Sequence, residues 1–189
     1  ETIETALDII KDCCYASPSS VSYIFELLWP IVSELAMNMI PNPEITNSNL
    51  SYILSAMSAM QVSLTWDVVG PQIEEIYQLI KSTGRYEDCF FDYFGTLRNI
   101  FKEIDPLYPQ IYEDLILPLT QSEEPLPPSL FLMISQFTPE VIDIEWLSMT
   151  AIQALNDYRT DVGEDALNSL QSMMFNMSKD NLIKFLQSV

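Results

Sequence analysis

Apolar residues recur at intervals of three and four along most of this chain, and strict alternation of apolar and polar residues is scarce. An interval of three or four places side chains on one face of an α-helix, whereas alternation would indicate a β-strand. The pattern therefore predicts an all-α fold with about ten helices of ordinary length. The clearest apolar rows, each expected to pack into the core, are Ile3-Leu7-Ile10-Cys14, Leu50-Ile53-Met57-Met60, Phe90-Phe94-Leu97-Phe101 and Leu167-Leu170-Met174-Met177.

Proline, glycine and short polar clusters interrupt these rows and predict where helices end. Ser19 and Ser20 are expected to cap a second helix, because a serine hydroxyl accepts hydrogen bonds from the first free N–H groups. Gly84 suits the left-handed conformation that often ends a helix. The pairs Trp66-Asp67 and Gly70-Pro71 are expected to separate a third helix from a fourth. Further breaks are predicted at positions 16–18, 41–43, 105–106, 121–128 and 157–163.

A proline followed within a few residues by apolar and acidic residues occurs four times. Pro30, Pro71 and Pro109 are spaced by about 40 residues, and Pro139 follows after a shorter interval. Proline is tolerated at the first position of a helix, so each is expected to open the second helix of a hairpin. A period of about 40 residues is typical of HEAT-type repeats, which stack to bury the apolar face that one hairpin leaves exposed. The sequence thus predicts an α-solenoid segment of a longer protein, with hairpins at positions 1–42, 45–84, 86–121, 128–158 and 161–189.

The charge balance narrows the range of partners. Asp and Glu number 27 against 8 Lys and Arg, which gives a formal net charge of −19. Such a field repels nucleic-acid phosphates and anionic membrane surfaces and favours Lys- and Arg-rich proteins. A surface that simply keeps the chain soluble is the alternative interpretation. Positions 21–40 form the longest apolar region, but Glu26, Pro30 and Glu34 make it too polar to be expected to cross a bilayer.

Catalytic chemistry has little support in the composition. The chain has no His, only four Gly and three Cys at positions 13, 14 and 89. Histidine-based acid–base catalysis, a glycine-rich phosphate loop and a paired-cysteine metal site are therefore not expected. We expect a protein that is not an enzyme and that needs no cofactor or metal. The cysteines are expected to be buried free thiols in a reducing compartment.

Acidic residues gather near the starts of the expected second helices. Equivalent helices of a stacked solenoid line one face, so these carboxylates would form a negative strip that binds a basic protein. A solvated outer face without a binding role remains the alternative. The candidate protein-binding residues are Glu34, Glu74, Glu75, Glu113, Asp114, Asp143 and Glu145, with Trp146 as a neighbour able to attract a cation over its ring.

The chain resembles the karyopherin-β family of importins and exportins. The resemblance rests on the paired helices, the acidic balance, the openings Trp29-Pro30-Ile31, Gly70-Pro71-Gln72-Ile73 and Tyr108-Pro109-Gln110-Ile111, and the stretch at positions 2–10. It implies a nuclear transport receptor of the cytoplasm and nucleus. The second helices of such a receptor face inward and bind basic cargo, with Trp29 and Trp146 as inner-face aromatics. It also implies the GTPase Ran as a partner of other parts of the parent chain. A HEAT-repeat scaffold for a multiprotein complex unrelated to transport is the alternative function.

Overall fold

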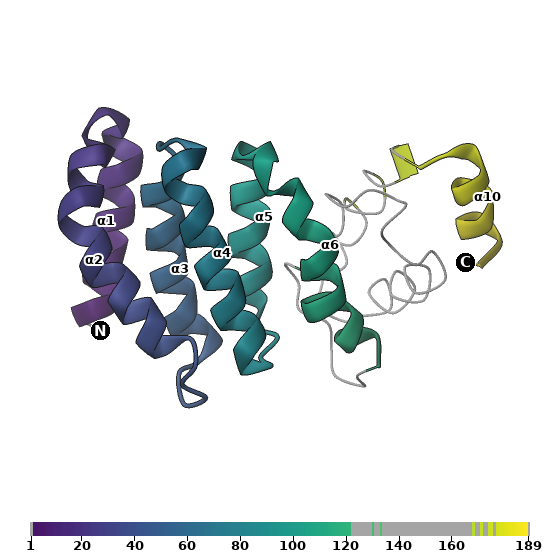
Figure 1. Ribbon diagram of the computed structural model, residues 1–189, viewed down its shortest axis with the longest axis horizontal. Coiled ribbons are helices and arrows are strands. Elements are labelled where there is room, and N and C mark those ends of the chain that lie inside the picture. Colours follow the sequence, from purple (N-terminus) through teal and green to yellow (C-terminus); the bar gives the residue numbers. More distant parts are fainter. Residues whose placement is uncertain are drawn as a thin grey trace. The chain divides into compact units, whose positions relative to one another are not determined.

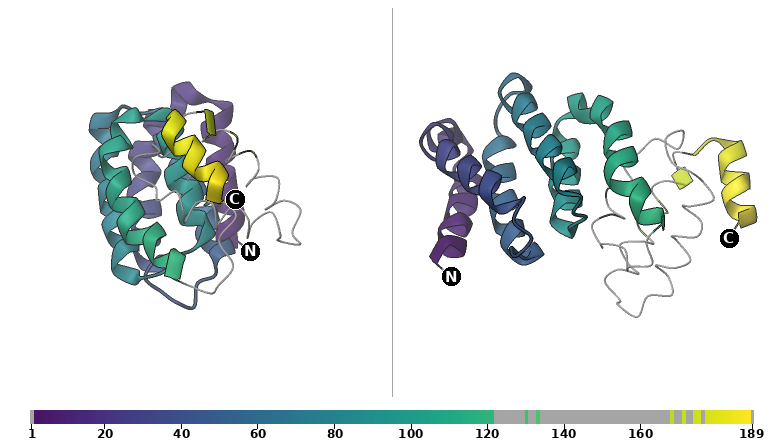
Figure 2. Two further views of the ribbon diagram at one scale, coloured as in Figure 1. Left: turned by 90° about the vertical axis from the view of Figure 1, so that its right-hand side faces the viewer. Right: turned by 60° about the horizontal axis from the view of Figure 1, so that its bottom comes forward.

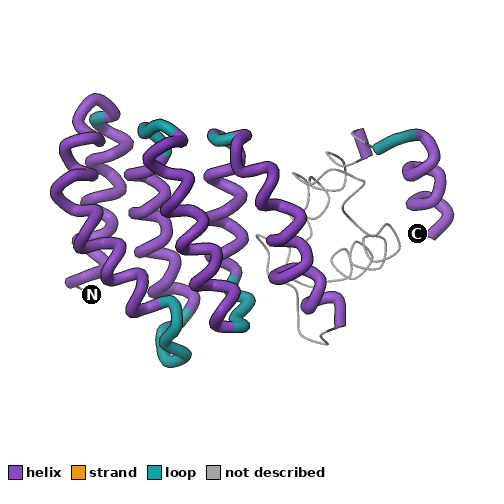
Figure 3. The backbone as a smooth tube through the Cα atoms, in the orientation of Figure 1, coloured by secondary structure: helices purple, strands orange, loops and turns teal. Residues whose placement is uncertain are grey.

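The computed structural model describes residues 2–121 and 177–188, together with residues 130, 133, 168, 171, 174 and 175. Every regular element in these residues is a helix and none is a strand, which confirms the predicted all-α class (Figures 1 and 3). The chain divides into two compact units, Glu1–Ile104 and Asp105–Val189. Each unit is described by itself below.

The first unit consists of five α-helices joined by short connections. Helices α1, α3 and α5 form one layer, and α2 and α4 form a second layer on one side of it (Figures 1 and 2). Successive helices run in opposite directions, and α3 packs against α1, α2 and α5. The elements are α1 (Thr2–Ala16), the 3-10 turn η1 (Pro18–Ser20), α2 (Val21–Met39), α3 (Asn47–Gln61), α4 (Trp66–Thr83) and α5 (Asp88–Ile100).

The core of this unit is centred on α3 and α5. The predicted rows Leu50-Ile53-Met57-Met60 and Phe90-Phe94-Leu97-Phe101 are buried throughout, so both predictions are confirmed. The row on α1 is only partly buried, because Leu7 and Cys14 face the core while Ile3 is 57% exposed. Helix α3 is surrounded by neighbours, and this explains why its apolar residues occupy several faces rather than one stripe.

A buried polar chain links three helices inside this apolar core. The Tyr93 hydroxyl on α5 donates a hydrogen bond to Gln61 Oε1 on α3 at 2.9 Å, and Gln61 Nε2 donates to Gln72 Oε1 on α4 at 3.2 Å. Burial raises the pKa of the Tyr93 phenol, which keeps it protonated and able to donate. The pairing satisfies polar groups that would otherwise be costly to bury.

Two predicted helix boundaries are wrong, because prolines lie inside helices. Pro30 lies in the middle of α2, and α4 begins at Trp66 and continues through Gly70-Pro71. A helical proline leaves the carbonyl four residues earlier without its usual donor. Both prolines are exposed, so water can reach the freed carbonyls.

Gly70 favours the second of these helices in two ways. Proline crowds the Cβ atom of the residue before it when that residue is helical, and glycine has no Cβ. A Cβ at Gly70 would also lie 2.9 Å from Cε2 of the Trp66 ring. The indole therefore packs over the glycine, and it also contacts the ring of Phe101 at a centroid distance of 5.9 Å.

Of three other predicted helix ends, two agree with the structure and one does not. Gly84 ends α4 in the left-handed conformation with φ 63°, as predicted. Ser20 precedes α2, but its side chain makes no capping bond and instead lies 3.0 Å from the Ser17 hydroxyl. The prediction of a serine cap is therefore wrong. Pro109 is near the start of a helix, as predicted, whereas Pro139 lies outside the described residues.

Arg85 fastens the loop that follows α2 to the end of α4. Its Nη1 donates to the carbonyls of Ile40 and Asn42 at 3.1 and 2.8 Å, and its Nη2 donates to the carbonyl of Ile45 at 2.7 Å. The same guanidinium forms an ion pair with Glu87 at 2.6 Å. One side chain therefore holds the ends of the two second-layer helices together.

The second unit begins with a nearly continuous helical segment of irregular pitch. Its buried residues include Tyr108, Ile111, Leu115 and Ile116, which agrees with the predicted helix at this point. The described elements are η2 (Lys102–Leu107, which starts in the first unit), α6 (Tyr108–Ile111), the π-helical turn η3 (Tyr112–Ile116), η4 (Leu117–Gln121) and α10 (Lys179–Ser188).

The described helices can be placed against the predicted hairpin ranges. Helices α1 and α2 fall within positions 1–42, α3 and α4 within 45–84, and α5 to η4 within 86–121. The predicted hairpin at 128–158 lies almost wholly outside the described residues, and of the one at 161–189 chiefly α10 is described.

Among the described residues, one helical stretch is long and apolar enough by length and composition to cross a membrane. It is Pro18–Met39, which comprises η1 and α2. This differs from the sequence expectation that Glu26, Pro30 and Glu34 make the region too polar. Core helices and signal sequences also meet this criterion, so the finding concerns composition alone. Little of the stretch is buried within the protein, and α2 therefore carries apolar residues on its outer face.

Candidate functional site

Three predicted carboxylates lie in the second layer of the first unit, and all are exposed. Glu34 is near the end of α2, and Glu74 and Glu75 are in the middle of α4. Their neighbours on the helix explain the exposure, because Ile73 and Ile76 face the core. An amphipathic helix places the acids on the opposite face.

The surroundings of these carboxylates are polar and acidic. Glu74 Oε1 accepts a hydrogen bond from Gln78 Nε2 at 2.8 Å, one turn further along α4. Two cations of the unit are held by other acids. Lys11 Nζ lies 2.7 Å from Asp8 Oδ1, and the Arg85 guanidinium pairs with Glu87. On α4 itself, Lys81 lies two turns after Glu74 on the same face, so Asp67, Glu74 and Glu75 against one base leave a net negative charge that attracts cations from solution.

Glu113 and Asp114 belong to the second unit, where the π-helical turn η3 holds them. Glu113 is exposed and Asp114 is half-buried. The candidate set is therefore divided between the two units, with the three carboxylates of α2 and α4 in one and the two of η3 in the other. Asp143, Glu145 and Trp146 lie outside the described residues.

Trp29, the inner-face aromatic that the family resemblance implied, packs within its own helix. Its indole stacks on the Phe25 ring at a centroid distance of 4.8 Å with an interplanar angle of 21°. Residues four apart are neighbours on a helix surface, so α2 itself creates this contact. The indole is half-buried and keeps part of its surface accessible.

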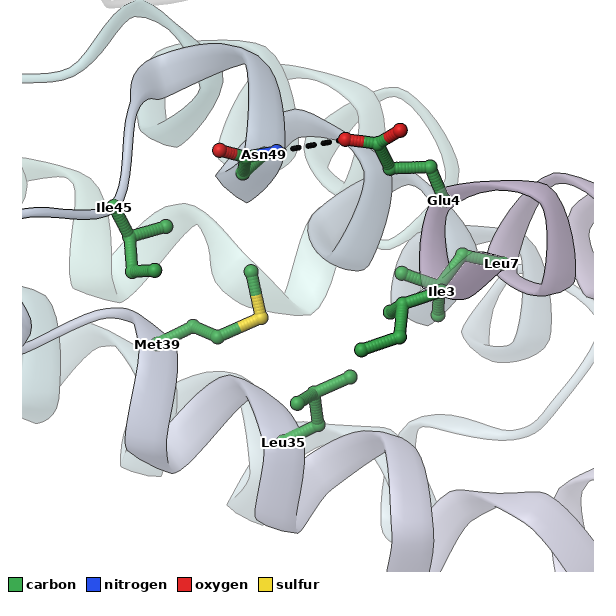
Figure 4. Close-up of a pocket in the computed structure, with 7 residues that line it drawn as sticks. All are labelled: Ile3, Glu4, Leu7, Leu35, Met39, Ile45 and Asn49. Atoms are coloured by element: carbon green, nitrogen blue, oxygen red, sulfur yellow. Dashed lines mark hydrogen bonds between the residues drawn. The ribbon is translucent and has the colours of Figure 1, made fainter. Parts of the chain in front are cut away.

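The structure also contains an apolar groove that the sequence analysis missed. Two pockets of about 520 and 560 Å³ open between the first half of α1 and the second half of α2, and both are lined by Ile3, Leu7 and Leu35 (Figure 4). The first pocket reaches Met39, Ile45 and Asn49 toward α3. The second extends past Ala6, Ile10, Ile31, Val32, Glu34 and Asn38.

One polar contact closes the rim of the first pocket. Asn49 Nδ2 donates to Glu4 Oε1 at 2.9 Å, as the dashed line in Figure 4 marks. The side chains of Ile3, Leu35 and Met39 point into the space between the helices. A carboxylate therefore stands beside a mostly apolar cavity wall.

A further apolar row continues from this groove along the outside of α2. Tyr23, Leu27 and Ile31 are 67%, 54% and 64% exposed and are spaced four residues apart. The spacing was visible in the sequence, but it has the same form in a buried row and an exposed one. We define the pocket-lining side chains of α1 and α2 together with this row as the α1–α2 groove.

The three cysteine side chains differ in how far they are buried. Cys14 and Cys89 are buried and unpaired, as predicted, while Cys13 is exposed, so the prediction for Cys13 is wrong. Burial is the main cause that raises the pKa of the Cys14 and Cys89 thiols, which makes both poor nucleophiles. Within the described part of the chain, no three His, Cys, Asp or Glu side chains are grouped to hold a metal ion.

These arrangements suit protein recognition, through a carboxylate-bearing face on α4 and an apolar groove beside α2. Comparisons of the chain with protein-family models, with curated proteins and with solved structures found no match.

Proposed function

We propose that this chain is a protein-binding segment that recognises Lys- and Arg-rich partners through carboxylates of its second-layer helices. The observation that carries the proposal is the exposure of Glu74 and Glu75 side by side on α4, in a chain with a net charge of −19. Arginine can form bidentate pairs with single carboxylates, and the wider field steers a basic partner toward them.

We further propose that the chain is part of an α-solenoid and, following the resemblance to karyopherin-β, of a nuclear transport receptor of the cytoplasm and nucleus. The stacking of α1, α3 and α5 in one layer supports the solenoid, because equivalent helices of a repeat array contact each other in this way. Basic cargo would bind the second layer. Ran would bind elsewhere in the parent chain.

Affinity cannot come from one carboxylate. An exposed ion pair contributes only about 0.2–1 kcal/mol, so several pairs must act together. Glu34 on α2 and Asp67 on α4 are also exposed and can extend the negative surface within the first unit. The expected signature is binding that weakens steeply as salt rises.

A HEAT-repeat scaffold is the second candidate, and the exposed apolar row Tyr23-Leu27-Ile31 favours it. An interface built on that row would bury apolar surface and respond weakly to salt. Salt dependence of partner binding therefore separates the two functions.

The test compares two charge reversals of equal size. In Glu74→Lys/Glu75→Lys the reversal is on α4, and in Asp12→Lys/Glu103→Lys it is on α1 and η2, where both residues are also exposed. Binding of a fluorescent Arg- and Lys-rich peptide is measured by anisotropy across a salt series. We expect roughly tenfold weaker binding for the α4 variant at low salt and a smaller loss for the control. Equal losses would mean that net charge, not the α4 face, attracts the peptide.

A further inference from the structure

We propose that the α1–α2 groove is a docking site for an amphipathic helix that carries Lys or Arg beside its apolar face. This inference concerns the apolar surface between α1 and α2, which shares Glu34 but not Glu74 or Glu75 with the surface proposed above, and it does not rest on that function. The partner is defined by its helical shape, its apolar face and its basic flanking residues.

The groove has the dimensions of a helix-binding surface. Its outer row runs from Tyr23 through Leu27 and Ile31 to Leu35, a length of about 18 Å along α2 at the rise of an α-helix. That length matches about three turns of a partner helix. The two pockets at its end offer space for one or two large apolar side chains, since they are lined mainly by Ile and Leu. Helical partners anchor in such grooves through apolar residues at positions i, i+4 and i+7.

Charge selects the kind of partner helix. Glu26 and Glu34 lie two turns apart beside the apolar row on the same side of α2, and both are exposed. Glu4 and Glu34 also line the two pockets. Positions 1–40 contain six acidic residues and one basic residue, Lys11, which pairs with Asp8. An acidic rim around an apolar floor complements a basic amphipathic helix.

The same charges argue against two other occupants. A second copy of the chain would bring another net charge of −19 against this rim. An anionic membrane surface would be repelled in the same way, although α2 has the length and composition of a membrane span. A second copy of the chain and a membrane are therefore tested separately, by sedimentation and by vesicle binding.

The binding experiment uses the full chain and three labelled peptides of about 18 residues, a length of five helical turns. The first is helical with a Leu face flanked by Lys and Arg. The second keeps the Leu face but carries Glu at the flanks, and the third is a scrambled form of the first. We expect the basic amphipathic peptide to bind most tightly, because the scrambled form keeps its Lys and Arg and can bind only through the carboxylates. Equal binding of the Glu-flanked peptide would overturn the charge argument, and equal binding of the scrambled peptide would overturn the helical one.

Two pairs of variants locate the site. Leu27→Ser/Ile31→Ser removes two exposed side chains of the row and should weaken binding by about tenfold or more. Its matched control is Val68→Ser/Ile100→Ser, which removes two exposed apolar side chains on α4 and α5 and should leave binding unchanged. Equal affinity of Leu27→Ser/Ile31→Ser and the wild-type chain overturns the proposal. Circular dichroism establishes that each variant remains helical.

Charge variants provide a second and independent readout. Glu26→Gln/Glu34→Gln should weaken binding of the basic peptide about threefold to tenfold and flatten its salt dependence. Glu74→Gln/Glu75→Gln should not, which separates this inference from the function proposed for α4. If Leu27→Ser/Ile31→Ser does not fold, the Gln variants decide the proposal, because unchanged binding by Glu26→Gln/Glu34→Gln would overturn it.

Two further measurements identify a different occupant. Sedimentation that shows a wild-type dimer, dissociated by Leu27→Ser/Ile31→Ser, would assign the groove to a second copy and overturn the proposal. Co-sedimentation with phosphatidylcholine vesicles that the same substitutions abolish would assign it to a membrane and overturn it too. A monomer that ignores vesicles and binds the basic peptide supports the proposal.

Discussion

Helices α2 and α4 occupy equivalent places in the first unit and yet differ in what they expose. They are 19 and 18 residues long, each has one internal proline, and both belong to the second layer. The outer face of α4 is mostly polar, with Asp67, Glu74, Glu75, Gln78 and Lys81 beside the exposed Val68. The outer face of α2 carries the apolar row Tyr23-Leu27-Ile31 instead.

On the inner faces α4 is the more apolar helix of the two. Helix α4 buries five apolar residues, whereas α2 buries three, which are only Val and Ala. Buried apolar area stabilises a helix in its place, so burial contributes more to holding α4 than α2, although α2 also packs closely against α3. In α4 most large apolar side chains are therefore buried and contribute to stability, whereas in α2 several of them are exposed on the outer surface. The buried residues are Val69, Ile73, Ile76, Tyr77 and Ile80 in α4 and Val21, Val32 and Ala36 in α2.

The largest expected effect comes from truncating the two inner faces. Ile73→Ala on α4 removes a fully buried side chain and should lower the free energy of unfolding by about 2–5 kcal/mol. Val32→Ala on α2 removes two carbon atoms and should cost about 1.5 kcal/mol. Urea unfolding followed by tryptophan fluorescence measures both, in a Trp146→Phe background so that the signal comes from the first unit. Ile73→Ala removes one carbon atom more than Val32→Ala, so a difference of no more than about 0.8 kcal/mol would show that the core holds α2 as firmly as α4.

The next largest effect concerns Arg85, which ties the two helices together at their ends. Arg85→Ala leaves three backbone carbonyls and Glu87 without their charged donor and should cost about 1.5–3 kcal/mol. Arg85→Lys should recover little of this, because one ammonium group cannot reproduce the fork that serves three carbonyls. Hydrogen exchange of residues 42–47 should accelerate in both variants. Lys102→Ala at an exposed position is the control and should change neither quantity appreciably.

The sequence predicted the parts of this fold that local pattern determines. The rows of α3 and α5 were assigned to the core correctly because apolar spacing and burial coincide there. Gly84 was assigned correctly because its conformation is a property of one residue. Exposure of Glu34, Glu74 and Glu75 likewise follows from helical amphipathicity.

The remaining features depend on tertiary contacts that local pattern does not contain. Pro30 and Pro71 both lie inside helices, and at Gly70 the Trp66 ring packs where a Cβ would be; that contact cannot be read from a Gly-Pro pair. The groove was missed because the row Tyr23-Leu27-Ile31 has the spacing of a core row. Only the absence of a packing neighbour in the described part of the chain distinguishes it.

A moderate effect is expected in the rates at which the two buried thiols react. Cys14 lies on α1, which borders the open α1–α2 groove, and Cys89 lies at the start of α5 next to the buried Phe90 and Phe91. A buried thiol is labelled only after local opening, and lightly packed elements open more often. In a Cys13→Ser background at mildly alkaline pH, iodoacetamide should label Cys14 about tenfold faster than Cys89, which corresponds to about 1.4 kcal/mol in opening free energy. Peptide mass spectrometry gives both rates, and identical rates would indicate that the unit opens as a whole.

The smallest expected effect on stability comes from exchanging the outer faces. Leu27→Gln/Ile31→Gln gives α2 a polar face like that of α4, and Glu74→Leu/Gln78→Leu gives α4 an apolar row like that of α2. All four side chains are exposed. Each pair should therefore change the free energy of unfolding by only about 0.5 kcal/mol, the usual size for a surface substitution.

Binding should change far more than stability in the same two variants. Leu27→Gln/Ile31→Gln should abolish binding of the basic amphipathic peptide, and Glu74→Leu/Gln78→Leu should create an additional apolar contact site beside Glu75. Peptide titration and urea unfolding of both variants make the comparison. A loss of several kcal/mol in the first pair would mean that the row on α2 contributes to the fold, in which case its exposure would not be the mark of a binding surface.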